Sequence, residues 1–209
     1  MARVVKIHRV HPQPRLVAKV VATLRSGGLI AYPTDSIFAL GCHLGDKVAM
    51  DRMRKIRKLD KHHNFTLVCS HLSEISLYAR VDNWTYRILK SFTPGPYTFI
   101  LPATREVPKR LQNKRRRTIG LRVPDHAVVR AMLELFGEPI MSSTLFLPGE
   151  DLPLTDAADI QETIGGRIDL IVDAGTVGIE PTTVIDLSKG DIEIIRDGLG
   201  DTSALVSRA

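Results

Sequence analysis

Short apolar runs of strand length alternate with amphipathic segments of helix length along almost the whole of this 209-residue chain. In the first such pair, aliphatic residues repeat at helical spacing from Pro14 to Leu24, Gly27 and Gly28 stop the helix, and a buried strand follows at residues 29–32. Alternation of this kind predicts helices packed on a sheet. The pattern therefore places the chain in the α/β class.

The same pattern predicts the remaining elements. We expect helices at residues 14–24, 47–59, 72–92 with a break near 81–83, 126–136 and 157–164. We expect strands at residues 29–32, 65–69, 97–101, 119–123, 140–144, 170–172, 184–187 and 192–195. The last three strands are so close in sequence that some must pair antiparallel. We therefore expect a mixed, twisted open sheet flanked by helices, in a single domain that spans residues 1–209.

The composition is that of a globular protein, because 44% of the residues are hydrophobic and 25% are charged. No apolar run approaches about 18 residues, and the first ten residues mix charges with aliphatics. We therefore expect no membrane span and no signal peptide, and we predict a cytoplasmic location. Cys42 and Cys69 lie in apolar stretches without metal-ligand spacing, which predicts buried or pocket-lining thiols and no structural zinc site.

Two basic runs, residues 52–63 and 109–117, stand out in a chain whose formal net charge is +6. If the runs meet on one side of the fold, their guanidinium groups would hold phosphate oxygens; the alternative is that each run is a solvated face. Few aromatic residues interleave with them, so we expect shape recognition of tRNA or double-stranded RNA instead of base stacking. The expected RNA-binding residues are Arg54, Lys58, Lys61, Lys114, Arg115, Arg116 and Arg117.

The expected helix at residues 47–59 carries much of the first run. Its apolar face is expected to contain Val48, Ala49, Ile56 and Leu59. Its opposite face is expected to be a cationic ridge of Arg54, Arg57, Lys58 and Lys61. His62 and His63 follow the helix, but so many cations nearby disfavour a bound metal ion.

Two polar segments are candidates for ligand binding. The loop at residues 32–41 combines a turn-forming proline with Thr34, Asp35 and Ser36, which is typical of a ligand pocket or of a capped turn. Residues 142–144 at a strand end offer hydroxyls to a phosphate, or form a plain strand terminus. The chain has no nucleophile elbow, Walker loop or dinucleotide fingerprint, which gives no support to hydrolase triads or standard NTPase chemistry.

Five ordered motifs carry a resemblance to a known family. They are Tyr32-Pro33-Thr34-Asp35-Ser36 through Leu40-Gly41, Thr93-Pro94-Gly95-Pro96-Tyr97-Thr98, Arg122-Val123-Pro124-Asp125-His126, residues 139–149, and Thr182-Thr183-Val184-Ile185-Asp186. The chain resembles the YrdC/YciO family over nearly its whole length, and Gly41-Cys42 and Leu147-Pro148-Gly149 are similar to the YciO branch. The resemblance implies a twisted sheet with a large positively charged cavity that binds nucleotides and double-stranded RNA or tRNA.

The resemblance also implies roles for single residues. The nucleotide-binding set would be Arg57, Thr98, Ser142, Thr144, Thr182 and Arg196. Thr34 would help to hold L-threonine, and Arg122 would meet the carboxylate of that amino acid.

The enzymatic branch of the family, threonylcarbamoyl-adenylate synthase, joins L-threonine, bicarbonate and ATP to give threonylcarbamoyl-adenylate and diphosphate. Its Lys-x-Arg and Ser-x-Asn motifs correspond here to Arg57-Lys58-Leu59 and Thr144-Leu145-Phe146, and a family histidine corresponds to Cys69. Leu59 and Phe146 cannot donate hydrogen bonds to phosphate, which predicts weakened adenylyl transfer.

The sequence therefore favours an RNA-binding and adenine-nucleotide-binding protein that acts in translation or tRNA modification. The alternative is a synthase with a divergent site. That enzyme would take ATP as substrate with Mg²⁺ as its counter-ion, and the residues indicate no resident cofactor.

Overall fold

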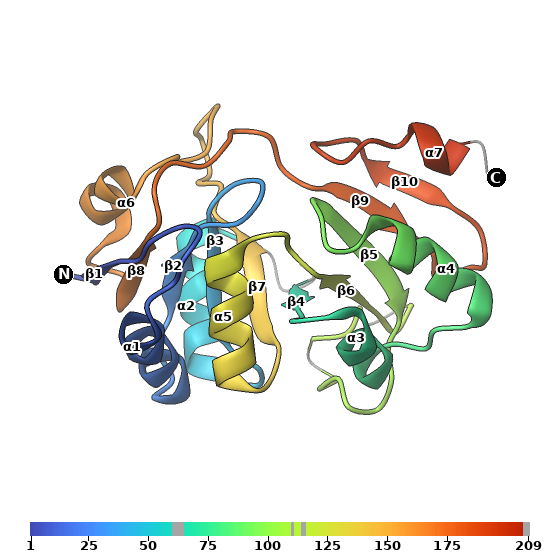
Figure 1. The fold of residues 1–209 in the computed structure, drawn as a ribbon, viewed down its shortest axis with the longest axis horizontal. Helices are drawn as coiled ribbons and strands as arrows, with labels where there is room; N and C mark the ends of the chain where they lie inside the picture. The colour runs from blue at the N-terminus through green and yellow to red at the C-terminus, as the bar shows by residue number, and fades with distance from the viewer. Residues whose placement is uncertain (60–64, 110, 114–115, 207–209) are drawn as a thin grey trace.

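The computed structural model describes residues 1–59, 65–109, 111–113 and 116–206. Within these residues, ten strands form one sheet in the order β1-β8-β2-β3-β7-β4-β6-β5-β9-β10 (Figure 1). The strands are β1 (Arg3–Lys6), β2 (Ile30–Tyr32), β3 (Ala39–His43), β4 (Thr66–Val68), β5 (Tyr97–Pro102), β6 (Thr118–Arg122), β7 (Ile140–Thr144), β8 (Leu170–Asp173), β9 (Thr183–Asp186) and β10 (Glu193–Arg196). This sheet, with its flanking helices, confirms the predicted mixed α/β fold.

Parallel and antiparallel neighbours occur together in the sheet. Strand β8 pairs in parallel with both β1 and β2, and the pairs β4–β6 and β5–β9 are also parallel. The remaining neighbours are antiparallel, including β9 and β10. The expected antiparallel pairing among the last three strands is therefore confirmed for β9 and β10, whereas β8 lies in the other half of the sheet.

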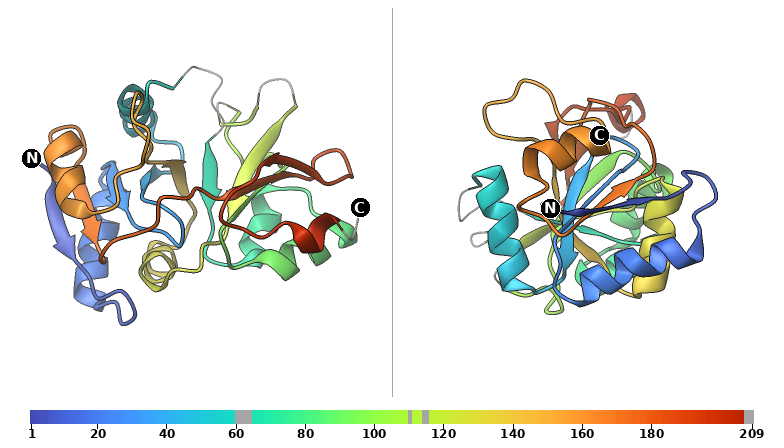
Figure 2. Two further views of the ribbon diagram at one scale, coloured as in Figure 1. Left: turned by 90° about the horizontal axis from the view of Figure 1, so that it is seen from above. Right: turned by 90° about the vertical axis from the view of Figure 1, so that its left-hand side faces the viewer.

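Helices cover both faces of the sheet. They are α1 (Pro14–Arg25), α2 (Lys47–Arg57), α3 (Leu72–Tyr78), α4 (Asn83–Phe92), α5 (Ala127–Phe136), α6 (Ala157–Ile164) and α7 (Ser203–Val206). Helices α1 and α5 pack on one face of β8, β2 and β7, and the right-hand view of Figure 2 shows them across the strands from α2. The apolar residues of α2, α3, α4 and α6 belong to a second buried cluster.

The strand register shows how one face of the sheet stays apolar from β3 to β5. Cys42, Met141, Leu67, Leu121 and Phe99 are paired in turn across five neighbouring strands, and all five are fully buried. Paired residues point to the same side of a sheet, so this row forms one continuous apolar surface. It packs in the cluster that contains α2, α3, α4 and α6.

Local sequence signals account for the ends of several helices. The carboxylate of Asp46 accepts a hydrogen bond from the Ala49 N–H at 2.9 Å, and that of Asp82 accepts one from the Thr85 N–H at 2.7 Å. Each bond satisfies a backbone donor that the first helical turn leaves free, and such a cap stabilises a helix by about 1 kcal/mol. Helix α5 ends at Gly137, whose φ of 80° suits a residue without a side chain.

The predicted helices and strands are found within a few residues of their expected bounds. The predicted apolar face of α2 is confirmed for Ala49 and Ile56, and Leu59 packs against the core cluster, but the prediction is wrong for Val48. Val48 is 71% exposed, and the buried stripe consists of Ala49, Met50, Met53 and Ile56. Two methionines that the prediction left out complete this stripe. Of the predicted cationic ridge, Lys58 is exposed, whereas Arg54 and Arg57 are half-buried. Strands β1 and β3 and helix α7 were not predicted, and β3 begins inside the segment 32–41 that was expected to be a loop.

The two cysteines are buried and unpaired, as expected, and burial raises the pKa of both thiols. In the described part of the chain, no helix combines the length and the apolar character that a membrane crossing requires.

Candidate functional site

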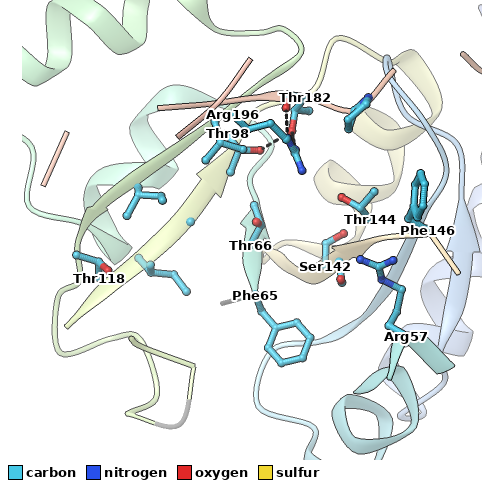
Figure 3. Close-up of a pocket in the computed structure, with 16 residues that line it drawn as sticks. Arg57, Phe65, Thr66, Thr98, Thr118, Ser142, Thr144, Phe146, Thr182 and Arg196 are labelled. Carbon is cyan, nitrogen blue, oxygen red and sulfur yellow. Dashed lines mark hydrogen bonds between the residues drawn. The ribbon is translucent and has the colours of Figure 1, made fainter. Parts of the chain in front are cut away.

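A cavity of about 460 Å³ is lined by the C-terminal end of α2, by strands β4, β5, β6, β7, β9 and β10, and by the segments that connect them (Figure 3). Its walls carry nine polar and six apolar side chains and one glycine. They are Arg57, Phe65, Thr66, Thr98, Ile100, Thr118, Ile119, Gly120, Ser142, Ser143, Thr144, Phe146, Pro181, Thr182, Val184 and Arg196. The six residues of the expected nucleotide-binding set all lie on these walls, although their role remains a prediction.

The register of the central strands forms the floor of this cavity. Ser142, Thr66, Gly120 and Ile100 are paired in turn across β7, β4, β6 and β5, so they share the face opposite the apolar row. Small residues at three of the four positions leave the hollow open. A Cβ atom on Gly120 would lie 3.0 Å from Thr66 Oγ1, so even alanine would fit tightly there.

Arg57 reaches the cavity from the last turn of α2. The helix ends at Lys58, whose left-handed backbone (φ 47°) turns the chain away directly after Arg57. Its Nε atom is buried without a hydrogen-bond partner, and no described residue forms an ion pair with its guanidinium. Burial lowers the pKa of Arg57, and the charge of Arg196 lowers it further. The side chain is thus a partly desolvated cation without a described partner.

Arg196 reaches the same cavity from β10, on the side opposite Arg57 (Figure 3). Its Nε and Nη2 atoms donate to the carbonyl and hydroxyl oxygens of Thr182 at 2.9 Å and 3.0 Å. The Thr182 hydroxyl also lies 3.1 Å from that of Thr98. Burial lowers the pKa of Arg196, and so does the charge of Arg122. Thr182 therefore fixes the orientation of the guanidinium but does not neutralise it.

The cavity carries two guanidinium groups and no aspartate or glutamate among its described lining residues. It also offers hydroxyl groups, although that of Ser142 already donates to the Leu40 carbonyl at 3.1 Å and lies 2.7 Å from the Tyr32 hydroxyl. No group of three or more His, Cys, Asp or Glu side chains that could hold a metal ion occurs in the described residues. The arrangement suits an anionic ligand.

Thr34 and Arg122, the expected threonine-binding pair, lie together but not among the residues that line this cavity. The Nη2 atom of Arg122 forms a close ion pair with Asp35 and donates to Ser36 Oγ at 3.1 Å. The Thr34 hydroxyl donates to the Ile37 carbonyl at 2.6 Å. We call Thr34, Asp35, Ser36 and Arg122 the Arg122 cluster.

Asp35 is the ion-pair partner of Arg122, a role that the sequence did not reveal. Both side chains are only 10% exposed, and the second carboxylate oxygen of Asp35 accepts from the Asp125 N–H at 3.0 Å. The only signal was the position of Asp35 in the polar loop at residues 32–41, because its partner lies 87 residues further along the chain.

His126 is a second residue that sequence reasoning missed. It precedes the first turn of α5, is 5% exposed, and has a buried Nδ1 atom without a hydrogen-bond partner among the described residues. Burial lowers the pKa of His126 to about 4, and the charge of Arg9 contributes to the shift. The imidazole is therefore neutral at physiological pH, beside the Arg122 cluster.

The expected RNA-binding residues are not brought together at the cavity. Arg54 pairs with Asp51 at 3.4 Å and lies over the Phe65 ring, 5.1 Å from its centroid, and Arg116 pairs with Asp186 at 3.2 Å. Lys58 and Arg117 are exposed. Lys61, Lys114 and Arg115 lie outside the described residues, as do His62 and His63. A second hollow of about 920 Å³ is lined by four cations, Arg80, Arg105, Lys109 and Arg117.

Comparison with known proteins gives one matching family model, described as Sua5_yciO_yrdC, telomere recombination, which covers residues 22–198. The Escherichia coli protein YciO is 47% identical over 201 residues, 96% of this chain and 98% of its own length. A threonylcarbamoyl-AMP synthase of Chromohalobacter salexigens is 30% identical over 176 residues, 84% of this chain and 94% of its own length.

Two solved structures also match this chain. The crystal structure of E. coli YciO matches with a TM-score of 0.94 and covers 97% of this chain and 98% of that one. The structure of Pyrococcus abyssi Sua5 complexed with L-threonine matches with a TM-score of 0.85 at 24% identity, over 93% of this chain and 57% of that one. The second likeness concerns the fold alone.

Proposed function

This chain belongs to the Sua5/YciO/YrdC family, and on that premise we propose that its cavity binds an adenine nucleotide. One observation carries the proposal: Arg57 and Arg196 face the same cavity, both partly desolvated, with no carboxylate among the described lining residues. Two like charges in such a place raise the free energy of the empty site. A phosphate between them would lower it and would accept hydrogen bonds from both guanidinium groups.

The size and chemistry of the cavity support the same ligand class. Its volume of about 460 Å³ is within the range of about 300–1,000 Å³ that is usual for small-molecule sites. Hydroxyl groups of Thr98, Thr144 and Thr182 line the cavity beside apolar groups such as Ile100 and Val184. A nucleotide has both kinds of surface, whereas inorganic phosphate has only the polar one.

The binding test compares wild-type protein with Arg57→Ala and Arg196→Ala by calorimetric titration of AMP and ATP. We expect each substitution to weaken binding by about tenfold to a hundredfold, since a charge-assisted hydrogen bond contributes about 1.5–3 kcal/mol. Arg87→Ala is the matched control, because Arg87 is an exposed arginine on α4 outside the cavity. Absence of AMP and ATP binding to the wild type, or equal affinities in all four proteins, would overturn the proposal.

Synthase activity is the enzymatic form of this proposal, supported by the threonylcarbamoyl-AMP synthase relative. L-threonine would enter near Thr34 and Arg122, where its carboxylate would share the Arg122 guanidinium with Asp35. Mg²⁺ would arrive with ATP, because the described cavity walls offer it no carboxylate. Leu59 and Phe146 supply no donors to the leaving diphosphate, so we expect slow turnover, measured as diphosphate release that requires both threonine and bicarbonate.

RNA is a second proposed partner, and the hollow lined by Arg80, Arg105, Lys109 and Arg117 supports it. None of these four exposed cations forms an ion pair with a described carboxylate. Because β6 begins next to Arg117, the hollow adjoins the strand that forms the cavity floor at Gly120. A folded RNA could therefore contact both sites.

The RNA proposal is tested by the salt dependence of duplex RNA and tRNA binding. Substituting glutamine for Arg105 and Lys109 together should reduce the slope of log affinity against log salt by about 1–2. The control pair Arg15 and Lys19, which are exposed on α1, should leave the slope unchanged when substituted in the same way. Equal slopes for both double variants would contradict a specific RNA surface at this hollow.

A further inference from the structure

Phe146 lies in an extended segment after β7 whose side chains alternate between the core and the cavity. Leu145 and Leu147 are 0% and 8% exposed and belong to the core cluster, whereas Thr144 and Phe146 line the cavity. The N–H of Leu145 donates to the Phe38 carbonyl at 2.9 Å, which ties the segment to the loop before β3. Two buried leucines therefore direct the Phe146 ring into the cavity.

The Phe146 ring lacks the packing that core aromatic rings have. Among the described residues it belongs to neither buried cluster, and no other aromatic ring contacts it. Phe65, the other phenylalanine on the cavity wall, is 1% exposed, is part of the core cluster and has Arg54 over its ring. Phe65 is thus a structural residue, whereas Phe146 presents an apolar ring face to whatever enters the cavity.

Phe146 also stands next to the cations that are proposed to hold phosphate. Figure 3 shows its ring beside Arg57 and Thr144, while Arg196, Thr98 and Thr182 lie across the cavity. A nucleotide bound with its phosphate between Arg57 and Arg196 has a planar base that needs an apolar surface nearby. The Phe146 ring is the aromatic surface of the described cavity walls that the core leaves free.

We propose that Phe146 is the stacking surface for the base of the bound nucleotide, so that the cavity selects nucleotides over phosphates without a base. This proposal rests on the proposed nucleotide-binding function, and it adds the reason why the site would prefer a ligand with a base. Stacking of a base on an aromatic ring contributes about tenfold to affinity and tolerates different bases, with the larger purine face bound more tightly than a pyrimidine.

The test is a calorimetric comparison of AMP with ribose 5-phosphate, which lacks the base. The wild type should bind AMP at least about tenfold more tightly. Phe146→Ala should weaken AMP binding by about tenfold and leave the affinity for ribose 5-phosphate within about twofold of the wild-type value. Phe146→Trp, which keeps an aromatic ring, should retain the preference for AMP over ribose 5-phosphate. Leu152→Ala is the matched control, because Leu152 is a 61% exposed apolar residue in the same connection before α6. It should change neither affinity.

A fluorescence measurement separates stacking from a purely structural role. The chain has one tryptophan, Trp84, so Phe146→Trp combined with Trp84→Phe reports on position 146 alone. AMP should quench this fluorescence and ribose 5-phosphate should not. Three outcomes would overturn the stacking proposal alone. Phe146→Ala could lose affinity for AMP and ribose 5-phosphate equally, or keep both affinities unchanged. The tryptophan at position 146 could show no quenching while AMP is bound. Failure of the wild type to bind either ligand would overturn the nucleotide proposal and stacking with it.

Discussion

Two arginine environments occur in this protein, and they differ in what balances the charge. Arg122 on β6 is 8% exposed and has Asp35 as an ion-pair partner, with Ser36 accepting a further hydrogen bond. Arg57 and Arg196 are also partly buried, but the described walls of their cavity contain no carboxylate. In the first environment the fold supplies the anion. In the second, the anion must come from outside.

This difference indicates which arginines lack a counter-charge when no ligand is bound. A buried guanidinium with a carboxylate partner is part of the folded structure, and removal of either partner leaves an uncompensated charge. A half-buried guanidinium without a carboxylate partner makes the empty site less stable and favours the binding of an anion. Removing the charge partner of Arg122 should therefore lower the free energy of unfolding. Removing the charge of Arg57 should raise the free energy of unfolding of the ligand-free protein but weaken anion binding.

Removal of Asp35 should produce the largest effect on stability. Asp35→Ala would leave Arg122 buried without its counter-charge, so we expect the free energy of unfolding to fall by about 3–5 kcal/mol. Urea denaturation followed by circular dichroism measures this loss. Arg130→Ala is the control, since the Arg130–Asp125 pair has side chains 49% and 66% exposed. It should cost about 1 kcal/mol or less. Equal losses in the two variants would show that the Asp35–Arg122 pair does not stabilise the fold.

Acid should weaken the Arg122 environment through His126. The pKa of His126 is about 4 in the folded protein, against 6.5 in the unfolded chain. The unfolded state therefore binds the proton first, and stability falls as pH drops from about 6.5 to about 4, by up to about 3 kcal/mol. His126→Gln should remove this part of the pH dependence, measured by urea denaturation at pH 7 and pH 4.5. His11→Gln, at an exposed site, should retain it. The same pH dependence in all three proteins would contradict the role of His126.

Local signals made most of the fold predictable from the sequence. The helix that ends at Gly137 and the strand at Ile140–Thr144 follow from a glycine stop and a short apolar run, and the structure contains both. The faces of α2 could not be predicted as well. Met50 and Met53 form its buried stripe, and methionine fits an irregular core gap that hydrophobic spacing does not reveal.

The candidate site was predictable only through the family resemblance. Its walls come from α2, six strands and three connecting segments, and sequence spacing does not show that these meet. The Asp35–Arg122 pair shows the same limit, because its partners are 87 residues apart and each resembles an ordinary polar residue in its own segment. Residue types alone identified the hydrogen-bond donors and the charged groups. Which charged groups have a partner of opposite charge depends on how the strands pair in the folded protein.

Removal of the Arg57 charge should produce the smallest effect on stability, and one of opposite sign. Arg57→Met retains much of the side-chain length but removes a partly desolvated charge that repels Arg196. We expect the apo protein to gain up to about 1 kcal/mol, because replacing such a charge by an apolar group is often neutral or stabilising. Thermal unfolding in a phosphate-free buffer measures the change. Arg87→Met, at an exposed position on α4, should leave the melting temperature unchanged.

Addition of phosphate should make the wild type more stable than Arg57→Met, which reverses their order of stability in phosphate-free buffer. An anion that binds only the folded state stabilises it by RT ln(1 + [L]/Kd), and the wild type has both guanidinium groups to bind it. At a phosphate concentration of about ten times Kd this gain is about 1.4 kcal/mol, enough to offset the advantage of Arg57→Met. If Arg57→Met destabilises the protein without phosphate, Arg57 has a structural partner, as Arg122 does. The contrast between the two arginine environments would then be wrong.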